Sequence, residues 1–271
     1  MTEFLRIGSE QIEVQWHRHG KRGNPTLVFL HEGLGCVDMW KDFPALLSQR
    51  TGCPALFFSR LGYGASDPCP TPWKINFMHK EGLKIVPAVI KEAKITDHIL
   101  IGHSDGGSIG IIYAGSPHAQ GLKGLITEAA HVFCEQITVE SIYQAKLNYE
   151  HHDLRPRLEK YHGKNTENAF RGWNDVWLHP GFIHWNIEKY LPRIKVPMFA
   201  LQGSRDQYGS LKQMDSIKNR TSRVRTYIVE DCRHSPHAEQ PGKVLDIMAG
   251  FINEIIRNDT SKKGRPLDRD K

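Results

Sequence analysis

The chain has 271 residues, of which 39% are hydrophobic, and this suffices for one sizeable α/β domain with a buried core. The formal net charge is +6, but part of the excess lies in the polar residues 261–271 and no nucleic-acid-binding motif accompanies it, so we expect no nucleic-acid partner. The five cysteines are odd in number and include no CxxC pair, which argues against a disulfide framework or a structural zinc site.

The first residues also restrict the setting of the protein. Residues 1–13 contain three glutamates and no apolar run long enough for a signal peptide, and no stretch approaches the length of a membrane span. We therefore expect a cytoplasmic protein that does not bind a membrane. Its expected partner is a small-molecule substrate. There is no HExxH motif and no Gly-Lys-Ser/Thr after a glycine-rich loop, so neither a metal nor a cofactor is expected.

Short apolar runs recur along the chain and are typical of strands buried on both faces of a parallel sheet. They lie at residues 26–30, 55–58, 98–101, 125–127, 198–201 and 224–229. Residues 4–16 alternate less cleanly, turn near Gly8 and are predicted as an antiparallel hairpin at one edge. Apolar residues at helical spacing in 39–48 and 244–256 predict helices between and after the strands. This alternation predicts a mostly parallel central sheet flanked by helices.

One interval interrupts the alternation. Between residues 131 and 191 no strand of the series is predicted, and the segment is too long for a plain loop. We interpret residues 1–131 and 192–258 as the core, 132–191 as a helical cap over the open end of the sheet, and 259–271 as a disordered basic tail. Within the cap, Trp173 and Trp177 are four residues apart and share a helix face, where they either pack in the cap or line a substrate pocket.

The strongest motif is GHSDG at residues 102–106, a Gly-x-Ser-x-Gly sequence between a predicted strand and a predicted helix. A strand that turns abruptly into a helix exposes a serine hydroxyl on a strained bend. The two glycines let the neighbouring backbone approach closely, and the helix N-terminus favours developing negative charge. The motif occurs by chance elsewhere, but in this setting it predicts that Ser104 is a nucleophile.

A serine hydroxyl needs a base, and the base needs an orienting carboxylate. His234 follows the last predicted strand, and Asp206 follows the strand at 198–201. Loops after parallel strands meet at the same edge of the sheet. We therefore predict that His234 is the base and that Asp206 fixes its tautomer and stabilises its cation. The chain order is Ser, Asp, His, which is the order of the α/β-hydrolase arrangement.

A glycine-rich turn, HEGLG at residues 31–35, follows the first long apolar run. It can direct backbone N–H groups at a substrate oxygen. We expect oxyanion donors from Gly33 or Leu34 and from Asp105, the residue after the nucleophile. Such donors are each worth about 3 kcal/mol in the transition state.

These segments together resemble the α/β-hydrolase superfamily, in its cap-bearing branch. The similarity runs from about residue 26 to 256 and rests on the segments around His31, Ser104, Asp206 and His234, on SRLGYGASD at 59–67, and on HSPH at 234–237 with EQP at 239–241. The resemblance implies the α/β-hydrolase fold with an inserted helical cap and an acyl-transfer mechanism, but it does not specify the substrate.

Two residues depart from the common pattern of that family. Glu32 stands where many members have glycine, and Asp105 stands where many have a bulky apolar residue. The Ser-Asp-Gly-Gly form resembles that of hydrolases acting on amino-acid esters, which implies that Asp105 could pair with a substrate ammonium group and repel a carboxylate. The alternative is that Asp105 caps the helix beginning at Gly106. Both acids are candidate pocket residues.

Other residues offer alternatives. Glu128, after the run at 125–127, is a second candidate for the orienting acid, and His237 is a second candidate for the base, although the family pattern favours His234. We interpret His103 as a packed structural residue. His131 and Cys134 lie where the chain leaves the sheet for the cap, so they are candidates for the pocket lining.

The combined prediction is a serine hydrolase that cleaves a small ester through a Ser-His-Asp triad and an acyl-enzyme, with a lactone, thioester, amide or carbon–carbon bond as other possible substrates. One alternative is a cofactor-free perhydrolase, haloperoxidase or lyase on the same triad. Another is a small-molecule binding protein without turnover, which a complete triad disfavours. An aspartyl nucleophile is disfavoured because Asp105 comes one residue after the elbow position.

Overall fold

The computed structural model describes residues 3–18 and 20–263. Within these residues, eight strands form one sheet in the order β1-β2-β4-β3-β5-β6-β7-β8. The β1–β2 and β2–β4 pairs are antiparallel and the remaining pairs are parallel. The strands are β1 (Glu3–Ile7), β2 (Glu10–His17), β3 (Thr26–Leu30), β4 (Ala55–Phe58), β5 (His98–His103), β6 (Leu122–Glu128), β7 (Met198–Gly203) and β8 (Val224–Val229). The predicted strands and the edge hairpin are thus confirmed, and the sheet has the α/β-hydrolase architecture.

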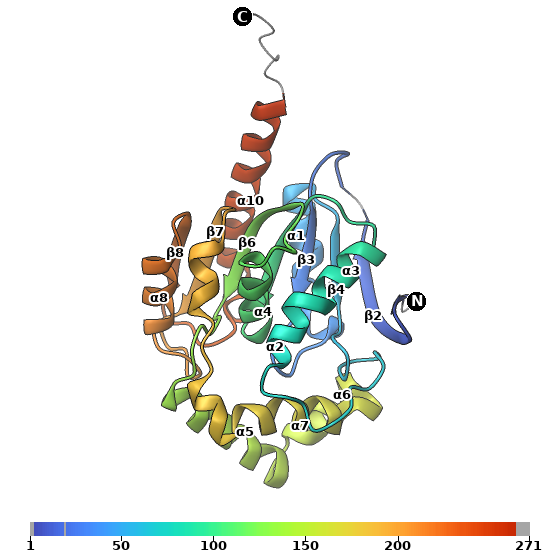
Figure 1. Cartoon of the computed structure of the whole chain (residues 1–271), viewed down its shortest axis with the longest axis vertical. Coiled ribbons are helices and arrows are strands. Elements are labelled where there is room, and N and C mark those ends of the chain that lie inside the picture. Colours follow the sequence, from blue (N-terminus) through green and yellow to red (C-terminus); the bar gives the residue numbers. More distant parts are fainter. Residues whose placement is uncertain (1–2, 19, 264–271) are drawn as a thin grey trace, which may run out of the picture.

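Helices cover both faces of this sheet (Figure 1). Alternate residues of each strand point to opposite faces, so Leu27 and Phe29 of β3 belong to one core cluster while Val28 and Leu30 belong to the other. The first cluster includes apolar side chains of α1 (Phe43–Thr51) and α10 (Pro241–Lys263). The second includes those of α2 (Phe77–Lys80), α3 (Val86–Glu92), α4 (Asp105–Ala114) and α8 (Lys212–Arg220). A one-turn helix, α9 (Pro236–Glu239), precedes α10.

Three helices between β6 and β7 form a layer at one end of the sheet (Figure 1): α5 (Gln136–His151), α6 (Leu154–His162) and α7 (Thr166–Trp177). Their buried side chains, including Phe170 and Trp177, belong to the same core cluster as α4. The helices of the segment predicted at 132–191 therefore share a hydrophobic core with one face of the sheet.

Two boundaries differ from the sequence prediction. The helix predicted for 39–48 is a short 3-10 turn, Val37–Trp40, followed by α1 from Phe43. Pro44 has no N–H and fits only the first turn of a helix, so one continuous helix cannot pass through it. At the other end α10 continues to Lys263, beyond the boundary predicted at residue 258, and Asp259 lies 3.8 Å from Lys123. The rest of the predicted tail, 264–271, lies outside the described residues.

Within residues 3–18 and 20–263, none of the helices combines the length and apolar character needed to cross a bilayer.

Candidate active site

Ser104 occupies a sharp turn between β5 and α4. Its φ of 51° and ψ of −116° are unusual for a residue with a side chain, and such backbone strain costs about 1–3 kcal/mol. The turn is closed by close backbone approaches at both flanking glycines. A Cβ at Gly102 would overlap the backbone of Gly106, and a Cβ at Gly106 would overlap the carbonyl oxygen of Leu30. The Gly-x-Ser-x-Gly spacing is therefore a steric requirement of this bend.

A continuous chain of hydrogen bonds joins Ser104, His234 and Asp206. The Ser104 Oγ lies 2.9 Å from Nε2 of His234, and Nδ1 of His234 lies 2.8 Å from Oδ1 of Asp206. Asp206 also accepts hydrogen bonds from the Tyr208 N–H at 2.9 Å and from Nε2 of Gln202 at 3.2 Å. Burial raises the pKa of Asp206, but the hydrogen bonds and charge of His234 outweigh it and hold that pKa below its ordinary value. An ionised Asp206 fixes Nδ1 as the protonated nitrogen and leaves Nε2 to accept from the serine.

The two alternative residues for these positions form a pair of their own. Glu128 accepts hydrogen bonds from the backbone N–H of His237 at 2.6 Å and from its Nδ1 at 2.9 Å. Burial lowers the pKa of His237, but the charge of Glu128 outweighs it and the net pKa is raised, which is typical of a buried ion pair. Glu128 therefore does not orient His234, and His237 does not reach Ser104 through any hydrogen bond within the described chain.

The Glu128–His237 pair and His103 hold the loop that carries His234. Nε2 of His103 donates to the carbonyl oxygen of His234 at 2.8 Å. Burial lowers the pKa of His103 to about 3, so this histidine is neutral and acts as a hydrogen-bonding support. The interpretation of His103 as a packed residue agrees with this contact.

The turn after β3 supplies a candidate oxyanion donor. Among the described residues, no hydrogen bond occupies the Gly33 N–H, and Gly33 lines the cavity around Ser104. The Leu34 N–H donates to the carboxylate of Glu32, and this removes Leu34 from the predicted donors. A glutamate side chain at this position folds back onto the amide two residues later, which is a local contact that a glycine there could not make. Gly33 and Asp105, the first residue of α4, remain as candidate donors.

The turn is held from several sides. The Tyr63 hydroxyl donates to the carbonyl oxygen of Gly33 at 2.9 Å, and Nε2 of His162, at the end of α6, donates to that of Leu34 at 2.9 Å. Nδ1 of His162 accepts from the Gly64 N–H at 3.0 Å, which fixes its tautomer. The helical layer and the loop after β4 thus both fix the geometry of the turn.

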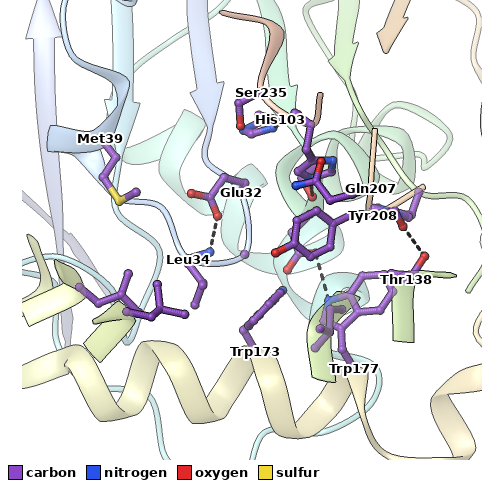
Figure 2. A pocket seen from close by; sticks show the side chains of 18 of the residues that line it. Glu32, Leu34, Met39, His103, Thr138, Trp173, Trp177, Gln207, Tyr208 and Ser235 are labelled. Carbon is purple, nitrogen blue, oxygen red and sulfur yellow. Dashed lines mark hydrogen bonds between the residues drawn. The ribbon is translucent and has the colours of Figure 1, made fainter. Parts of the chain in front are cut away.

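A cavity of about 350 Å³ opens above Ser104. Figure 2 shows Glu32 and Leu34 on one side, Tyr208 and Gln207 on the other, and Trp173 and Trp177 projecting from α7. Of the predicted pocket residues, the lining includes Glu32, Asp105, His131, Trp173 and Trp177.

Cys134 is not part of that lining. Its N–H donates to the carbonyl oxygen of Trp185 at 3.1 Å and its side chain packs against the core, because the chain turns away from the cavity after His131. Tyr208 also lines the cavity, although no sequence pattern predicted it, and its ring lies 4.7 Å from that of His234. Its position two residues after Asp206, on a loop at the same sheet edge, was the available signal.

Asp105 is buried, with 1% of its surface exposed. Its Oδ1 accepts from Nε1 of Trp177 at 3.2 Å, and its Oδ2 has no hydrogen-bond partner among the described residues. The helix-capping alternative is wrong: Asp105 is the first residue of α4, Ser104 occupies the N-cap position, and no side-chain cap is formed. Burial raises the pKa of Asp105 to about 6, with Arg60 opposing the shift and Glu32 adding to it. Next to the nucleophile, Asp105 thus keeps one carboxylate oxygen that is enclosed by protein and has no hydrogen-bond partner among the described residues.

No group of three or more metal-ligating side chains gathers anywhere in the part of the chain that the structure describes.

The chain is similar to several known proteins over most of its length. The family model of the alpha/beta hydrolase family matches residues 27–247. A 2-succinyl-6-hydroxy-2,4-cyclohexadiene-1-carboxylate synthase from Salmonella heidelberg is 24% identical over 262 residues, covering 87% of this chain and 97% of that protein. A proline iminopeptidase from Saccharolobus solfataricus is 25% identical, covering 87% of each chain. Among solved structures, a carboxylesterase structure from Nitrososphaera gargenis superposes with a TM-score of 0.76 at 17% identity, covering 94% of this chain and all of the other.

Proposed function

Because the chain belongs to the alpha/beta hydrolase family, we propose that it is a serine hydrolase that cleaves a small carboxylic ester through an acyl-enzyme. The observation that carries the proposal is the continuous hydrogen-bonded chain from Asp206 through His234 to Ser104, with separations of 2.8 and 2.9 Å. The separation between Ser104 and His234 is short enough for proton transfer between them. The nucleophile also lies on a strained turn at the base of a cavity.

In the proposed mechanism, Nε2 of His234 accepts the Ser104 proton as Oγ attacks the carbonyl carbon. Asp206 stabilises the resulting imidazolium without itself taking the proton. His234 then protonates the leaving alkoxide, and the acyl group remains on Ser104. A water molecule enters, gives its proton to His234 and attacks the acyl carbon, which releases the acid and restores the serine.

The negative oxygen of each tetrahedral intermediate would be held by the N–H groups of Gly33 and Asp105. The α4 N-terminus adds its partial positive charge at the same place. Preorganised donors of this kind cost no reorganisation when charge develops, and losing one typically costs about 10²–10³ in kcat.

Two carboxyl groups, Glu32 and Asp105, line the cavity close to the reacting serine. They favour a substrate that carries an ammonium group near its carbonyl and disfavour one that carries a carboxylate there. The cation on the cavity wall, Arg157, lies toward its mouth with a side chain 65% exposed and 3.8 Å from Asp153. We propose an amino-acid ester as the preferred class within small esters.

The same carboxylates support a second candidate, hydrolysis of an amide bond next to a free amine. The name of the proline iminopeptidase relative is compatible with such a reaction.

We also propose a reducing, cytoplasmic setting and a small-molecule partner. The five cysteines are all free thiols.

The nucleophile is tested with a fluorophosphonate probe and identification of the labelled residue. We expect Ser104 to be labelled, and we expect Ser104→Ala to abolish both labelling and hydrolysis of p-nitrophenyl acetate. Labelling that persists in Ser104→Ala would overturn the proposal. Labelling of Ser104 without hydrolysis of any ester, thioester or amide would favour a lyase, a perhydrolase or a binding protein instead.

The substrate class is tested with a matched pair, the p-nitrophenyl esters of alanine and of propionic acid, which differ only in the ammonium group. We expect a higher kcat/KM for the alanine ester at pH 7.5 and loss of that preference in Asp105→Asn. An unchanged preference in the variant would refute recognition of the ammonium group by Asp105.

A further inference from the structure

Arg60 lies behind the turn that carries Gly33, and it is the one Lys or Arg side chain that is buried within residues 3–18 and 20–259. It follows β4 by two residues, and its surface is 1% exposed. Its guanidinium stacks over the Tyr63 ring at 4.6 Å. In the described part of the chain no carboxylate forms an ion pair with Arg60, although Asp105, Glu81 and Glu32 interact with it electrostatically. A buried cation without an ion pair is expensive to maintain and calls for an explanation.

The contacts of Arg60 converge on one peptide group. Its Nη2 donates to the carbonyl oxygen of Glu32 at 2.9 Å. Its backbone N–H donates to Nε2 of His31 at 3.0 Å, which makes Nδ1 the protonated nitrogen of that ring. Nδ1 of His31 donates in turn to the same Glu32 oxygen at 2.7 Å. Arg60 thus binds the Glu32 carbonyl both directly and through His31.

The carbonyl of Glu32 and the N–H of Gly33 belong to the same planar peptide. In a trans peptide the two groups point in opposite directions, so fixing the oxygen fixes the direction of the N–H. A cation at the oxygen also draws electron density toward it and makes the N–H a stronger donor. Gly33 itself has no room for a side chain, because a Cβ would overlap the Trp173 ring. The free Gly33 N–H and the charge of Arg60 therefore lie at opposite ends of one dipole.

The acids around the site give this cation a second effect. Glu32 and Asp105 line the cavity, and negative charge on either would oppose an oxyanion at Ser104. Arg60 interacts electrostatically with both carboxylates. Its charge therefore offsets theirs at the position where the oxyanion develops.

We propose that Arg60 is a positioning residue of the oxyanion hole, which orients and polarises the Glu32–Gly33 peptide so that the Gly33 N–H stabilises the tetrahedral intermediate. The inference rests on the proposed serine-hydrolase function. It concerns transition-state stabilisation alone, because Arg60 is not among the residues that line the cavity.

The test compares Arg60→Met, which removes the charge and the donors at similar length, with Arg60→Lys, which keeps the charge. Hydrolysis of p-nitrophenyl acetate gives kcat and KM, and phenylboronic acid serves as the probe because its serine adduct is tetrahedral and anionic. We expect Arg60→Met to lower kcat by about 10- to 100-fold with KM changed by less than about 2-fold, and to weaken phenylboronic acid binding by a similar factor. Arg60→Lys should restore part of both losses.

A matched control separates positioning from loop stability. Ser66 lies in the same loop and is buried, and its hydroxyl donates to the carbonyl of Ser59 and accepts from the Glu13 N–H. Ser66→Ala should lower the unfolding midpoint while leaving phenylboronic acid affinity unchanged. The inference is overturned if Arg60→Met binds phenylboronic acid like the unmodified protein, or if Ser66→Ala weakens that binding to the same extent.

A measurement on the unmodified protein applies if the Arg60 variants do not fold. In its crystal structure with phenylboronic acid, a boronate oxygen should lie about 2.7–3.1 Å from the Gly33 nitrogen. An adduct on Ser104 whose oxygens avoid Gly33 overturns the positioning inference and leaves the hydrolase proposal intact. Absence of any adduct or labelling at Ser104 overturns the hydrolase proposal itself.

Discussion

Asp105→Asn should change the pH dependence of stability in a defined direction. The Asp105 carboxyl is 1% exposed and has one unpartnered oxygen among the described residues, so its ionised form is poorly solvated. Burial raises its pKa from 3.8 to about 6. Below pH 3.8 the carboxyl is protonated in both the folded and the unfolded chain. As the pH rises toward 6 the unfolded chain ionises first, and the folded state loses stability through that window.

The size of the effect follows from the pKa difference. Each pKa unit corresponds to about 1.36 kcal/mol, so the shift of Asp105 amounts to about 3 kcal/mol of unfolding free energy, lost progressively from below pH 3.8 to above pH 6. An asparagine does not titrate. The unfolding free energy of Asp105→Asn, relative to the unmodified protein, should therefore rise by about 3 kcal/mol across that window. Any constant difference from the hydrogen bonds of the new amide cancels in this comparison.

The assay is urea unfolding of both proteins at five pH values from 3 to 8. As a control, Asp153→Asn changes an aspartate whose side chain is 70% exposed, and its urea unfolding is measured at the same pH values. A difference for Asp105→Asn that is flat within about 0.5 kcal/mol, or that falls as the pH rises, would refute the conclusion that Asp105 is desolvated in the folded chain.

Two further predictions test the roles of the buried pairs and of the elbow. Asp206→Asn should lower kcat about 10³- to 10⁴-fold. Glu128→Gln should instead lower the free energy of unfolding by about 3–5 kcal/mol, while kcat per folded molecule falls less than about 10-fold. A larger loss of kcat in Glu128→Gln than in Asp206→Asn would show that Glu128 orients the base. Gly106→Ala should destabilise the protein by about 1–3 kcal/mol or prevent folding, because the new Cβ would overlap the Leu30 carbonyl. Gly250 lies on exposed helical backbone with no neighbouring atoms, so Gly250→Ala should be neutral or stabilising in the same denaturation assay. Equal effects of the two alanines would contradict the steric account of the elbow.

The fold and the order of the site residues were predictable from local patterns. Continuous apolar runs identify strands that are buried on both faces, and the helical segments between them make those strands parallel. Parallel strands place the residues after their carboxyl ends at one edge, so Ser104, Asp206 and His234 could be expected to approach one another. The hydrogen-bonded chain that joins these three residues lies at that edge.

Several finer features could not be predicted in this way. The sequence offered Glu128 and Asp206 as orienting acids, and both end up in buried pairs with histidines of the same loop. It offered Leu34 as an oxyanion donor, but the side chain of Glu32 takes that amide. In each case the competing groups have the same chemistry and lie on the same edge of the sheet, so only their positions distinguish them.

The sequence by itself determined the sheet, the helices and the strained turn at Ser104, because these depend on residues that are close in the chain. The tertiary structure decided which carboxylate meets which histidine, that Asp105 faces the cavity beneath Trp177, and that Arg60 binds the Glu32 carbonyl. The physical reason is that hydrogen bonds and desolvation change over fractions of an ångström, and such distances between remote segments are set by the packing of the whole core.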